Sequence, residues 1–533
     1  MVKRLISIKR KVKPQKYKTI KQIATTARLR PDNSGKAAAP ALDAEEWFRR
    51  ELAGNGDIVF RDLMIGGSED LEAVLIYTYG SIDKNTLNVN IIKPLMNFKD
   101  KAGKDSGSSS FVKRLMDSCL TVGTIKALKD KNLAKDEMFQ GRVILLLNNI
   151  DQIIILEVAG VKARQVTEPE NERTLRGSKE GFIEDLWNNV AVIRKTLPDP
   201  TLKVEVSKVG RRTKTDLAVL YVGGLADAKL VKEVKSRIKK IDIDGVLANG
   251  YIEAFIEDNP YSPFPQTQGT EKPDKVVAAL LEGRIAVVLD RTPYVLLVPA
   301  QLIQFFQAPE DYYERTYIGT YIRILRAIAF LVTTSAAPAY IALTSFHPEL
   351  VPLELLLNIA ELRKKVPFPP VIEALIMEFV IESLREAGLR LPTAVATTLG
   401  VVGGIILGDA AVRSNLVSPA MIIVITITII CNFIIPNYSM SLVIRLLRLF
   451  LILAAASFGA FGITLGWLII IIHLCSLESF GVPYFAPIAP TRFKDLKDLY
   501  IRVPIWAMKE RPVSIPGYNK KRVVNAREQK DGK

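Results

Sequence analysis

The sequence predicts a mixed protein, with two α/β subdomains followed by a multi-span bundle of transmembrane helices. Its composition fits neither a pure transporter nor a soluble enzyme, because 49% of the 533 residues are hydrophobic and 24% are charged. Before residue 320, no apolar segment is longer than a strand. After it, long apolar runs follow one another, as expected of a chain that crosses lipid. They cover residues 327–343, 392–407, 419–435, 449–461 and 463–474.

The positive charge lies at the two ends of the chain. Residues 1–40 hold twelve Lys or Arg and one acid, and residues 491–533 hold twelve Lys or Arg and five acids. We predict a disordered basic arm at 1–41 and a basic cytosolic tail at 486–533. Such tails are either solvated or in contact with anionic lipid, where each basic residue contributes ~1 kcal/mol. Nucleic acid is not an expected partner, because Tyr17 is the only aromatic residue of the arm. No apolar segment of a signal peptide follows the basic start, so we expect a cytoplasmic N-terminus.

A repeated motif predicts two related α/β subdomains. In each copy, an apolar strand is followed by Tyr-x-x-Gly-x-x-Asp and then by an amphipathic helix. The copies begin at Tyr77 and Tyr221. The glycine turns the chain out of the strand, and the aspartate stands where a helix N-cap belongs. We place the first subdomain at 42–140 and the second at 141–307, so that two apolar strands between residues 143 and 158 open the second.

The second subdomain offers three residues from which a catalytic site could be assembled, Arg176, Glu180 and Arg284. Structural packing is the better account, because the chain's two histidines, His347 and His473, lie in the membrane part. The sequence contains no phosphate-binding glycine loop, zinc-protease motif or nucleophile elbow. Its three cysteines lie far apart and form no CxxC pair. We therefore expect no enzyme, no cofactor and no metal site.

The charges that flank the apolar region predict its topology. Arg323 and Arg326 precede the first span, and residues 491–511 after the last span are basic. Both ends are therefore expected in the cytoplasm, with an even number of crossings in a bundle at 308–485. The last apolar segment must contain two helices, because some 40 residues in one helix would extend ~60 Å. We expect the break at 459–462.

A sixth crossing would be the helix at 371–386, which carries several acids. At ~100° per residue, Glu378, Glu382 and Glu386 form one stripe, and Glu373 lies apart from it. Carboxylates inside a membrane must face water or partner charges. The stripe is therefore our candidate ion path between subunits, and structural pairing with arginine is the alternative. A helix lying flat on the membrane is a further alternative, and it would leave four crossings.

Small residues predict a helix interface after this helix. Gly400, Gly404 and Gly408 follow one another at four-residue intervals, and the spacing recurs at Gly462 and Gly466. Glycines at this interval let helix backbones approach one another in lipid. They indicate close packing and identify no ligand.

Short motifs rich in proline, glycine and charged residues occur over roughly residues 45–512. They are Glu168-Pro169, Arg176-Gly177, Glu180-Gly181-Phe182, Ser262-Pro263-Phe264-Pro265, Glu271-Lys272-Pro273-Asp274, Leu281-Glu282-Gly283-Arg284, Pro309-Glu310-Asp311-Tyr312-Tyr313, Pro367-Phe368-Pro369-Pro370 with Glu373-Ala374, and Ser479-Phe480-Gly481-Val482-Pro483-Tyr484. In this order they resemble the GerA family, the A subunits of nutrient germinant receptors in endospore-forming bacteria. The family usually has arginine at Lys272, so the charge is kept here and the planar guanidinium is lost.

The resemblance implies a receptor in the inner membrane of the spore. In this family the A subunit works with a transporter-like B subunit and a lipoprotein C subunit, and nutrient is thought to be sensed mainly through B. The A subunit is thought to form a homo-oligomeric ion channel that starts germination. The related AF-type protein of sporulation stage V shares the architecture and is the first alternative. A membrane-anchored enzyme and a non-conducting membrane scaffold are the others.

Overall fold

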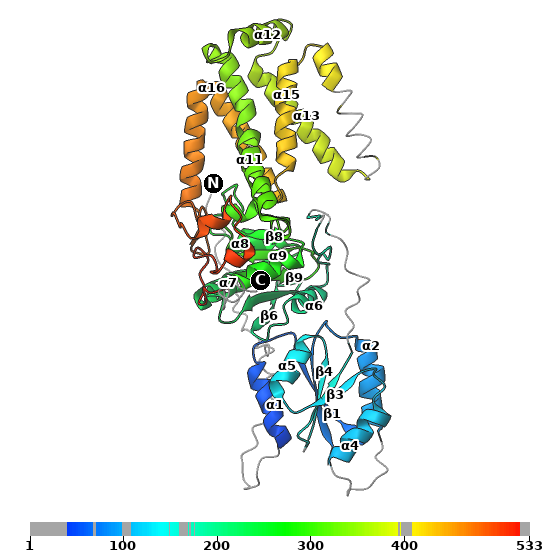
Figure 1. The fold of residues 1–533 in the computed structure, drawn as a ribbon. Coiled ribbons are helices and arrows are strands. Elements are labelled where there is room, and N and C mark those ends of the chain that lie inside the picture. Colours follow the sequence, from blue (N-terminus) through cyan, green and yellow to red (C-terminus); the bar gives the residue numbers. More distant parts are fainter. Residues whose placement is uncertain are drawn as a thin grey trace, which may run out of the picture.

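The computed structural model shows three parts that follow one another along the long axis of the molecule (Figure 1). An α/β unit lies at one end, a second α/β unit lies in the middle, and long helices form the other end. The structure describes residues 40–67, 71–98, 108–148, 150–158, 169, 172–174, 176–392, 395, 404 and 408–522. The predicted arm at 1–41 lies almost entirely outside the described residues, and Gly400 also lies outside them.

The first unit is a five-stranded antiparallel sheet with helices on both faces. Its helices are α1 (Pro40–Glu51), α2 (Lys84–Leu87), α3 (Lys93–Asn97), α4 (Ser108–Arg114) and α5 (Lys131–Phe139). Its strands are β1 (Ile58–Met64), β2 (Glu72–Thr78), β3 (Ile125–Leu128), β4 (Val143–Leu147) and β5 (Ile153–Leu156), in the order β1-β2-β4-β5-β3. Successive side chains of β2 point to opposite faces of the sheet. Leu75 packs with Leu95 of α3, and Ile76 packs with Phe48 and Met138 of α1 and α5.

The boundary predicted between the two units, at residues 140 and 141, is wrong. Both β4 and β5 belong to the first sheet, where β4 pairs with β2 and places Leu146 opposite Val74. All five residues of β4 are buried, because β4 contributes to the cores on both faces of the sheet. A continuous apolar strand of this kind does not indicate which sheet it joins. The first unit therefore extends at least to Leu156.

The second unit has the same topology as the first. Its helices are α6 (Leu186–Thr196), α7 (Ala228–Lys240), α8 (Asn249–Ile256) and α9 (Pro273–Leu281). Its strands are β6 (Leu202–Val209), β7 (Thr215–Val222), β8 (Gln268–Thr270), β9 (Ile285–Leu289) and β10 (Val295–Val298), in the order β6-β7-β9-β10-β8. In both units the third strand in the chain lies at an edge of the sheet, and the last two strands fill the centre.

The repeated motif occupies the same place in both units, at the end of the second strand. Gly80 and Gly224 have φ values of 88° and 79°, which residues with a side chain rarely adopt, and each turns the chain out of its strand. The carboxylate of Asp83 accepts backbone hydrogen bonds at the start of α2, and that of Asp227 does so at the start of α7. The structure thus contains the two related α/β units that the motif predicts.

A buried ion pair joins the two units. Arg194 of α6 donates to both carboxylate oxygens of Asp57, over 2.8 and 3.1 Å, and each side chain is only 1% exposed. Arg194 also donates to the carbonyl of Asp199, and its guanidinium lies 4.9 Å from the centre of the Phe139 ring. We call Asp57 and Arg194 the first joint. Because its charges balance and its guanidinium is well supplied with partners, it holds the two sheets together as one body.

Long helices form the opposite end of the molecule. They are α11 (Thr316–Ser345), α12 (Leu353–Arg363), α13 (Pro370–Arg390), α15 (Pro419–Phe433) and α16 (Tyr438–Ser476), and the short helix α10 (Glu310–Tyr313) precedes them. The main contacts of α11 are with α15 and α16, and α13 contacts all three of these helices. Among the described residues, α11 and α16 are long and apolar enough to cross a membrane, and α15 is a shorter apolar helix. The six crossings therefore stay a prediction.

Helix α16 consists of two limbs, as its length predicts. Gly459 has φ 58° and ψ −136°, which are not helical values, and the chain folds back there (Figure 1). A Cβ at Gly462 would overlap the carbonyl oxygen of Ala454, and a Cβ at Gly466 would lie 2.6 Å from Leu451. The limbs therefore touch along a face where only glycine fits. The predicted break is confirmed at Gly459.

The chain after α16 returns to the second unit. The short strands β11 (Glu478–Ser479) and β12 (Val482–Pro483) lead into residues 486–522, which we call the tail (Figure 1). Arg511 of the tail donates to the carbonyl of Leu281 over 2.6 Å, and Gly517 forms a β-bridge with Ala226. The segments before α11 and after α16 thus lie at the same end of the helical part, as an even number of crossings requires.

Candidate functional site

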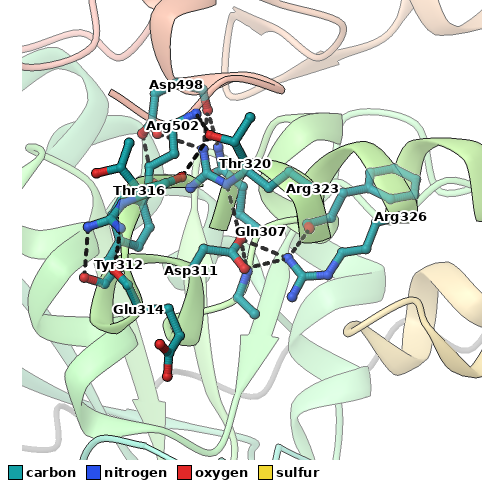
Figure 2. A network of polar contacts seen from close by, with 12 residues as sticks. Gln307, Asp311, Tyr312, Glu314, Thr316, Thr320, Arg323, Arg326, Asp498 and Arg502 are labelled. Carbon is teal, nitrogen blue, oxygen red and sulfur yellow. Dashed lines mark hydrogen bonds and ion pairs between the residues drawn. The ribbon is translucent and has the colours of Figure 1, made fainter. Parts of the chain in front are cut away.

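A buried aspartate holds the segment that follows the second unit against the first long helix. Asp311 of α10 accepts hydrogen bonds from Arg323 over 3.1 Å and from Arg326 over 2.8 and 2.7 Å (Figure 2). The two arginines are three residues apart on α11, so both face α10. All three side chains are buried, and the Asp311 side chain has no exposed area. A carboxylate buried to this degree is retained only with cationic partners.

The tail completes this cluster from the other side. Asp498 accepts from Arg323 over 2.7 Å and from the Tyr312 hydroxyl over 2.7 Å (Figure 2). Arg502 donates to the carbonyls of Glu314 and Tyr312 over 2.5 and 2.9 Å. We call Asp311, Arg323, Arg326, Asp498 and Arg502 the second joint. It connects the start of the first long helix to the segment that follows the last.

The second joint is not balanced in charge, because it contains three guanidinium groups and two carboxylates. Two of its donors, Nη2 of Arg323 and Nε of Arg502, have no hydrogen-bond partner among the described residues. Both guanidinium groups instead lie over the Tyr312 ring, 5.0 and 5.9 Å from its centre. Burial and the nearby Asp498 carboxylate raise the pKa of Tyr312, so its hydroxyl stays a donor at physiological pH.

Motif residues from three segments meet beside this joint. Gly177 has φ 115°, and a Cβ there would lie 2.5 Å from the ring of Tyr313. The Tyr313 hydroxyl donates to Asp274 over 2.5 Å. Lys272 is buried, donates to Thr174 over 2.9 Å, and lies 3.8 Å from Asp274. The motifs around residues 176, 272 and 312 therefore form one packed cluster.

The three residues considered for catalysis each have separate partners. Arg176 pairs with Glu314 at 3.3 Å, and Glu180 pairs with Lys195 at 3.4 Å, both in exposed positions. Arg284 is buried and donates to the side chain of Gln268 and to two backbone carbonyls. Burial lowers the pKa of Arg284 to about 10.

The remaining motif positions near Glu180 are structural. Gly181 is buried, and Phe182 is a core residue of the second unit whose backbone N–H donates to the carbonyl of Glu271 over 2.9 Å. These contacts anchor the segment before α6 to the loop that carries Lys272.

The proline-rich loop at 262–265 packs against the end of α16. The Ser262 hydroxyl and Nε2 of His473 are 2.9 Å apart. The buried ring of Phe264 lies 5.9 Å from the His473 ring and 6.3 Å from the Tyr484 ring. Its neighbours Pro263 and Pro265 are exposed and half-buried. This loop therefore connects the second unit to the last long helix.

The predicted acidic stripe of α13 faces the first limb of α16. Glu378 pairs with Arg448 at 2.6 Å, and Glu382 pairs with Arg445 at 2.5 Å. As the acids advance along α13, their partners recede along α16, so the two helices run in opposite directions where they meet. The arginine pairing considered as an alternative for this stripe is thus present within one chain.

The acids of the stripe differ in exposure. The Glu378 side chain is largely buried, whereas those of Glu382 and Glu386 are 55% and 57% exposed. Glu386 pairs with Arg390 of its own helix at 2.5 Å. Phe379 of the same helix is 74% exposed. Within the part of the chain that the structure describes, one side of α13 therefore presents two carboxylates and an aromatic ring.

The proline motif before α13 positions a fourth acid. Pro369 is the N-cap of α13 and Pro370 its first residue, where the missing N–H of proline costs no helical hydrogen bond. One turn later, the fully buried Glu373 accepts from the backbone N–H of Ser418 over 2.8 Å and lies 3.4 Å from Arg363. Glu373 thus connects three helices, a role that sequence reasoning missed.

The two glycine series differ in their surroundings. Within this chain, a Cβ at Gly404 or Gly408 would meet no described atom within 4 Å, whereas Gly462 and Gly466 are packed between the limbs of α16. The helix interface predicted for the first series is therefore not formed with described residues of the same chain at these two positions.

Sequence reasoning also missed the tail residues of the second joint. Asp498 and Arg502 contributed only to a count of charges. The available signal was the presence of Asp495 and Asp498 in an otherwise basic segment, since isolated acids among many bases often have specific partners. Asp495 indeed accepts from the backbone N–H groups of Val513 and Ser514.

Several known proteins are similar to this chain. The chain matches the family described as Bacillus/Clostridium GerA spore germination protein over residues 46–514. Spore germination protein KA of Bacillus subtilis (strain 168) is 40% identical over 474 residues, which cover 89% of this chain and 86% of that protein. The uncharacterized membrane protein YfkQ of the same organism is 39% identical, with 90% of this chain and 92% of that protein covered.

A solved structure is also similar in sequence. It is the crystal structure of the N-terminal domain of the A subunit of the Bacillus megaterium spore germinant receptor GerK3, which is 32% identical. The match covers 49% of this chain and 95% of that domain, with a TM-score of 0.39. The family match, in contrast, includes both α/β units, the long helices and most of the tail. The chain therefore belongs to the GerA family of spore germination proteins.

Proposed function

We propose that this chain is the A subunit of a nutrient germinant receptor in the inner membrane of the spore. In this proposal several copies form an ion channel that opens during germination, together with a transporter-like B subunit and a lipoprotein C subunit. Family membership supports a role in spore germination, and the apolar helices α11 and α16 support a membrane location. The proposal assigns the chain no enzymatic activity.

The observation that carries the channel proposal is the exposed side of α13. Glu382 and Glu386 are more than half exposed although α13 packs against apolar helices. Lipid does not accommodate such carboxylates, because an ionised group in hydrocarbon costs several kcal/mol. Water, or another copy of the chain, must therefore cover this side. Copies arranged around a water-filled axis satisfy both conditions, and rings of charged side chains are a common lining of ion pores.

The ion pairs with α16 support an α13 that is inserted beside the other helices. Two acids on successive turns of α13 pair with two arginines on successive turns of α16, so the stripe faces another long helix where the two meet. Glu378 has a structural place in this arrangement, because it is largely buried beside Arg448. We therefore assign the water-filled path to Glu382 and Glu386. The open surroundings of Gly404 and Gly408 also provide a surface on which a second subunit can pack closely.

Ion flux in reconstituted vesicles tests the channel. The variant combines Glu382→Gln and Glu386→Gln in the complete receptor. Glutamine has nearly the shape of glutamate and no charge, so we expect altered conductance or ion selectivity. Asp409→Asn is the matched control, because Asp409 is also a half-exposed acid paired with an arginine of its own helix. Wild-type flux in the double variant would contradict the path. An absence of flux from the wild-type receptor would favour a non-conducting scaffold. A separate observation, the absence of neighbouring genes for B-type and C-type subunits, would favour the AF-type protein.

A further inference from the structure

An apolar cavity lies where the long helices leave the second unit. Its volume is about 440 Å³. Side chains from the proline-rich loop, α11, the second limb of α16 and the tail line it, including Phe264, Phe330, Leu474 and Tyr500. The rings of Phe306, Phe330 and Trp467 pack edge to face and form one wall, with centre distances of 5.3 and 5.8 Å.

The cavity opens on the outer surface of the helical part. Leu331 of α11 and Ile471 of α16 both line it and are 54% and 43% exposed. The neighbouring residues Ile328 and Ile472 are exposed and apolar as well. The mouth is thus part of the surface that lipid would cover if these helices cross a membrane. What enters the cavity from this side must therefore be apolar.

Exposed aromatic side chains occur on α11 and on the tail, both of which line the cavity. Tyr317 and Tyr321 are exposed on the first turns of α11, and Phe493 and Trp506 are exposed on the tail. The backbone N–H of Arg502 donates to Thr320 over 3.1 Å, which places the tail beside those turns. Tyrosine and tryptophan are enriched where membrane proteins meet the head groups of the bilayer. If α11 and α16 cross a membrane, the cavity therefore lies just inside the boundary of the leaflet on the side of the second unit.

The surrounding charge favours an anionic head group. Residues 486–522 hold nine Lys or Arg and three acids. The second joint also has one more guanidinium group than carboxylates, and its Arg323 contributes to the cavity wall. Basic residues near the membrane surface each attract anionic lipid by ~1 kcal/mol. Charge and shape therefore indicate the same kind of ligand.

We propose that this cavity binds an acyl chain of an anionic phospholipid, whose head group lies against the basic tail. The site rests on the membrane location given under the proposed function, and it does not require that the receptor conduct ions. The bound chain fills the space between α11, α16 and the tail. It therefore braces the second joint, because Arg323 belongs to both the joint and the cavity wall. Lipid composition would thereby affect how firmly the helices are connected to the second unit.

Photolabelling of the full-length protein tests the site. The probe is phosphatidylglycerol with a photoreactive group in the middle of one acyl chain, added to delipidated protein in detergent at a few molecules per chain. We expect labelling to concentrate in peptides that contain residues 302–307, 323–331 and 467–474. Phosphatidylcholine with the same acyl chain should label these peptides less, because it lacks the net negative charge.

Variants of α11 distinguish the cavity from general lipid contact. Ala327→Phe places a ring in the cavity, so labelling of these peptides should fall by about tenfold. Ile328→Phe is the matched control, because residue 328 is adjacent but faces outward, and it should label like the wild type. If Ala327→Phe does not purify as folded protein, Leu331→Trp serves as the second cavity-filling variant.

Two results would overturn the proposal. One is labelling that is as strong around the exposed Ile423 and Ile427 of α15 as around the cavity. The other is labelling that a folded cavity-filling variant leaves unchanged. Labelling of the cavity without ion flux would support the lipid site and contradict the channel. Ion flux without labelling would support the channel and contradict the lipid site.

Discussion

Both joints of the molecule depend on buried aspartate–arginine pairs, and they differ in charge balance and in origin. The first joint matches one carboxylate with one guanidinium through two hydrogen bonds, and both groups come from the α/β units. The second combines three guanidinium groups with two carboxylates from α10, α11 and the tail. Arg323 and Arg502 each keep one buried donor without a described partner. The first joint therefore fixes the two sheets together. The second joint keeps hydrogen-bond donors on Arg323 and Arg502 that are unused among the described residues, so its bonding can respond to a change nearby.

The largest effect is expected from Asp311→Asn. This change leaves Arg323 and Arg326 buried without a carboxylate between them, and breaking a buried pair in this way costs roughly 3–5 kcal/mol. Thermal unfolding of the full chain in detergent should start at a lower temperature. Hydrogen exchange should rise first in the tail and in the first turns of α11. Unchanged protection of the tail would show that the second joint does not hold it.

A smaller effect is expected from Asp57→Asn at the first joint. It leaves one guanidinium without its carboxylate, and Arg194 keeps the carbonyl of Asp199 and the Phe139 ring as partners. The cost should be about 3 kcal/mol, at the lower end for a broken buried pair. Hydrogen exchange should rise between β1 and α6 and remain unchanged in the tail. The two aspartate variants thus serve as controls for each other, and the same exchange pattern in both would contradict the separation of the joints.

One glycine beside each joint allows backbone strain to be separated from steric overlap. Gly177→Ala combines a strained φ of 115° with a Cβ 2.5 Å from the Tyr313 ring, and should destabilise the chain by about 2 kcal/mol. Gly54→Ala has a φ of 82° but no atom within 4 Å of its Cβ, so it should cost about 1 kcal/mol from strain alone. Denaturant unfolding of both variants measures the difference. Equal losses would mean that Tyr313 moves aside at no cost.

The smallest effect concerns pH and arises beside the loop that connects the second unit to α16. Burial and the adjacent Glu257 carboxylate raise the pKa of Glu253 to about 7 from an ordinary value near 4.5. The folded state thus holds this proton more tightly than the unfolded state, so stability falls as pH rises from about 4.5 to 7 and stays lower above. Glu253→Gln should therefore gain about 1 kcal/mol at pH 8, since the group is partly exposed and the full shift does not apply. At pH 4, where both forms are neutral, the gain should vanish.

The sequence allowed local features to be predicted and failed for contacts between distant segments. The N-caps at Asp83 and Asp227 and the break at Gly459 follow from a few neighbouring residues, and the structure contains all three. The assignment of β4 failed, because a strand buried on both faces looks the same in either sheet.

In the candidate site, too, local features could be predicted and contacts between distant segments could not. The stripe of Glu378, Glu382 and Glu386 follows from helical periodicity, but its pairing with Arg445 and Arg448 depends on how two helices are packed. Sequence reasoning considered pairing with arginine and did not identify these two partners. The second joint was missed for the same reason, because its partners come from opposite ends of the helical region.

The separation of those partners affects how the protein is made. Gln307 donates to the backbone carbonyl of Asp498, a residue 191 positions later, and every long helix lies between the two. On the ribosome, Arg323 therefore emerges long before Asp498 can reach it. If the long helices cross a membrane, as proposed, a chain with one helix inserted in the wrong direction would carry its tail to the opposite side of the bilayer, where Asp498 and Arg502 could not meet their partners. This contact would then close only after every long helix had been made, and only in a chain whose tail ended on the same side as α10.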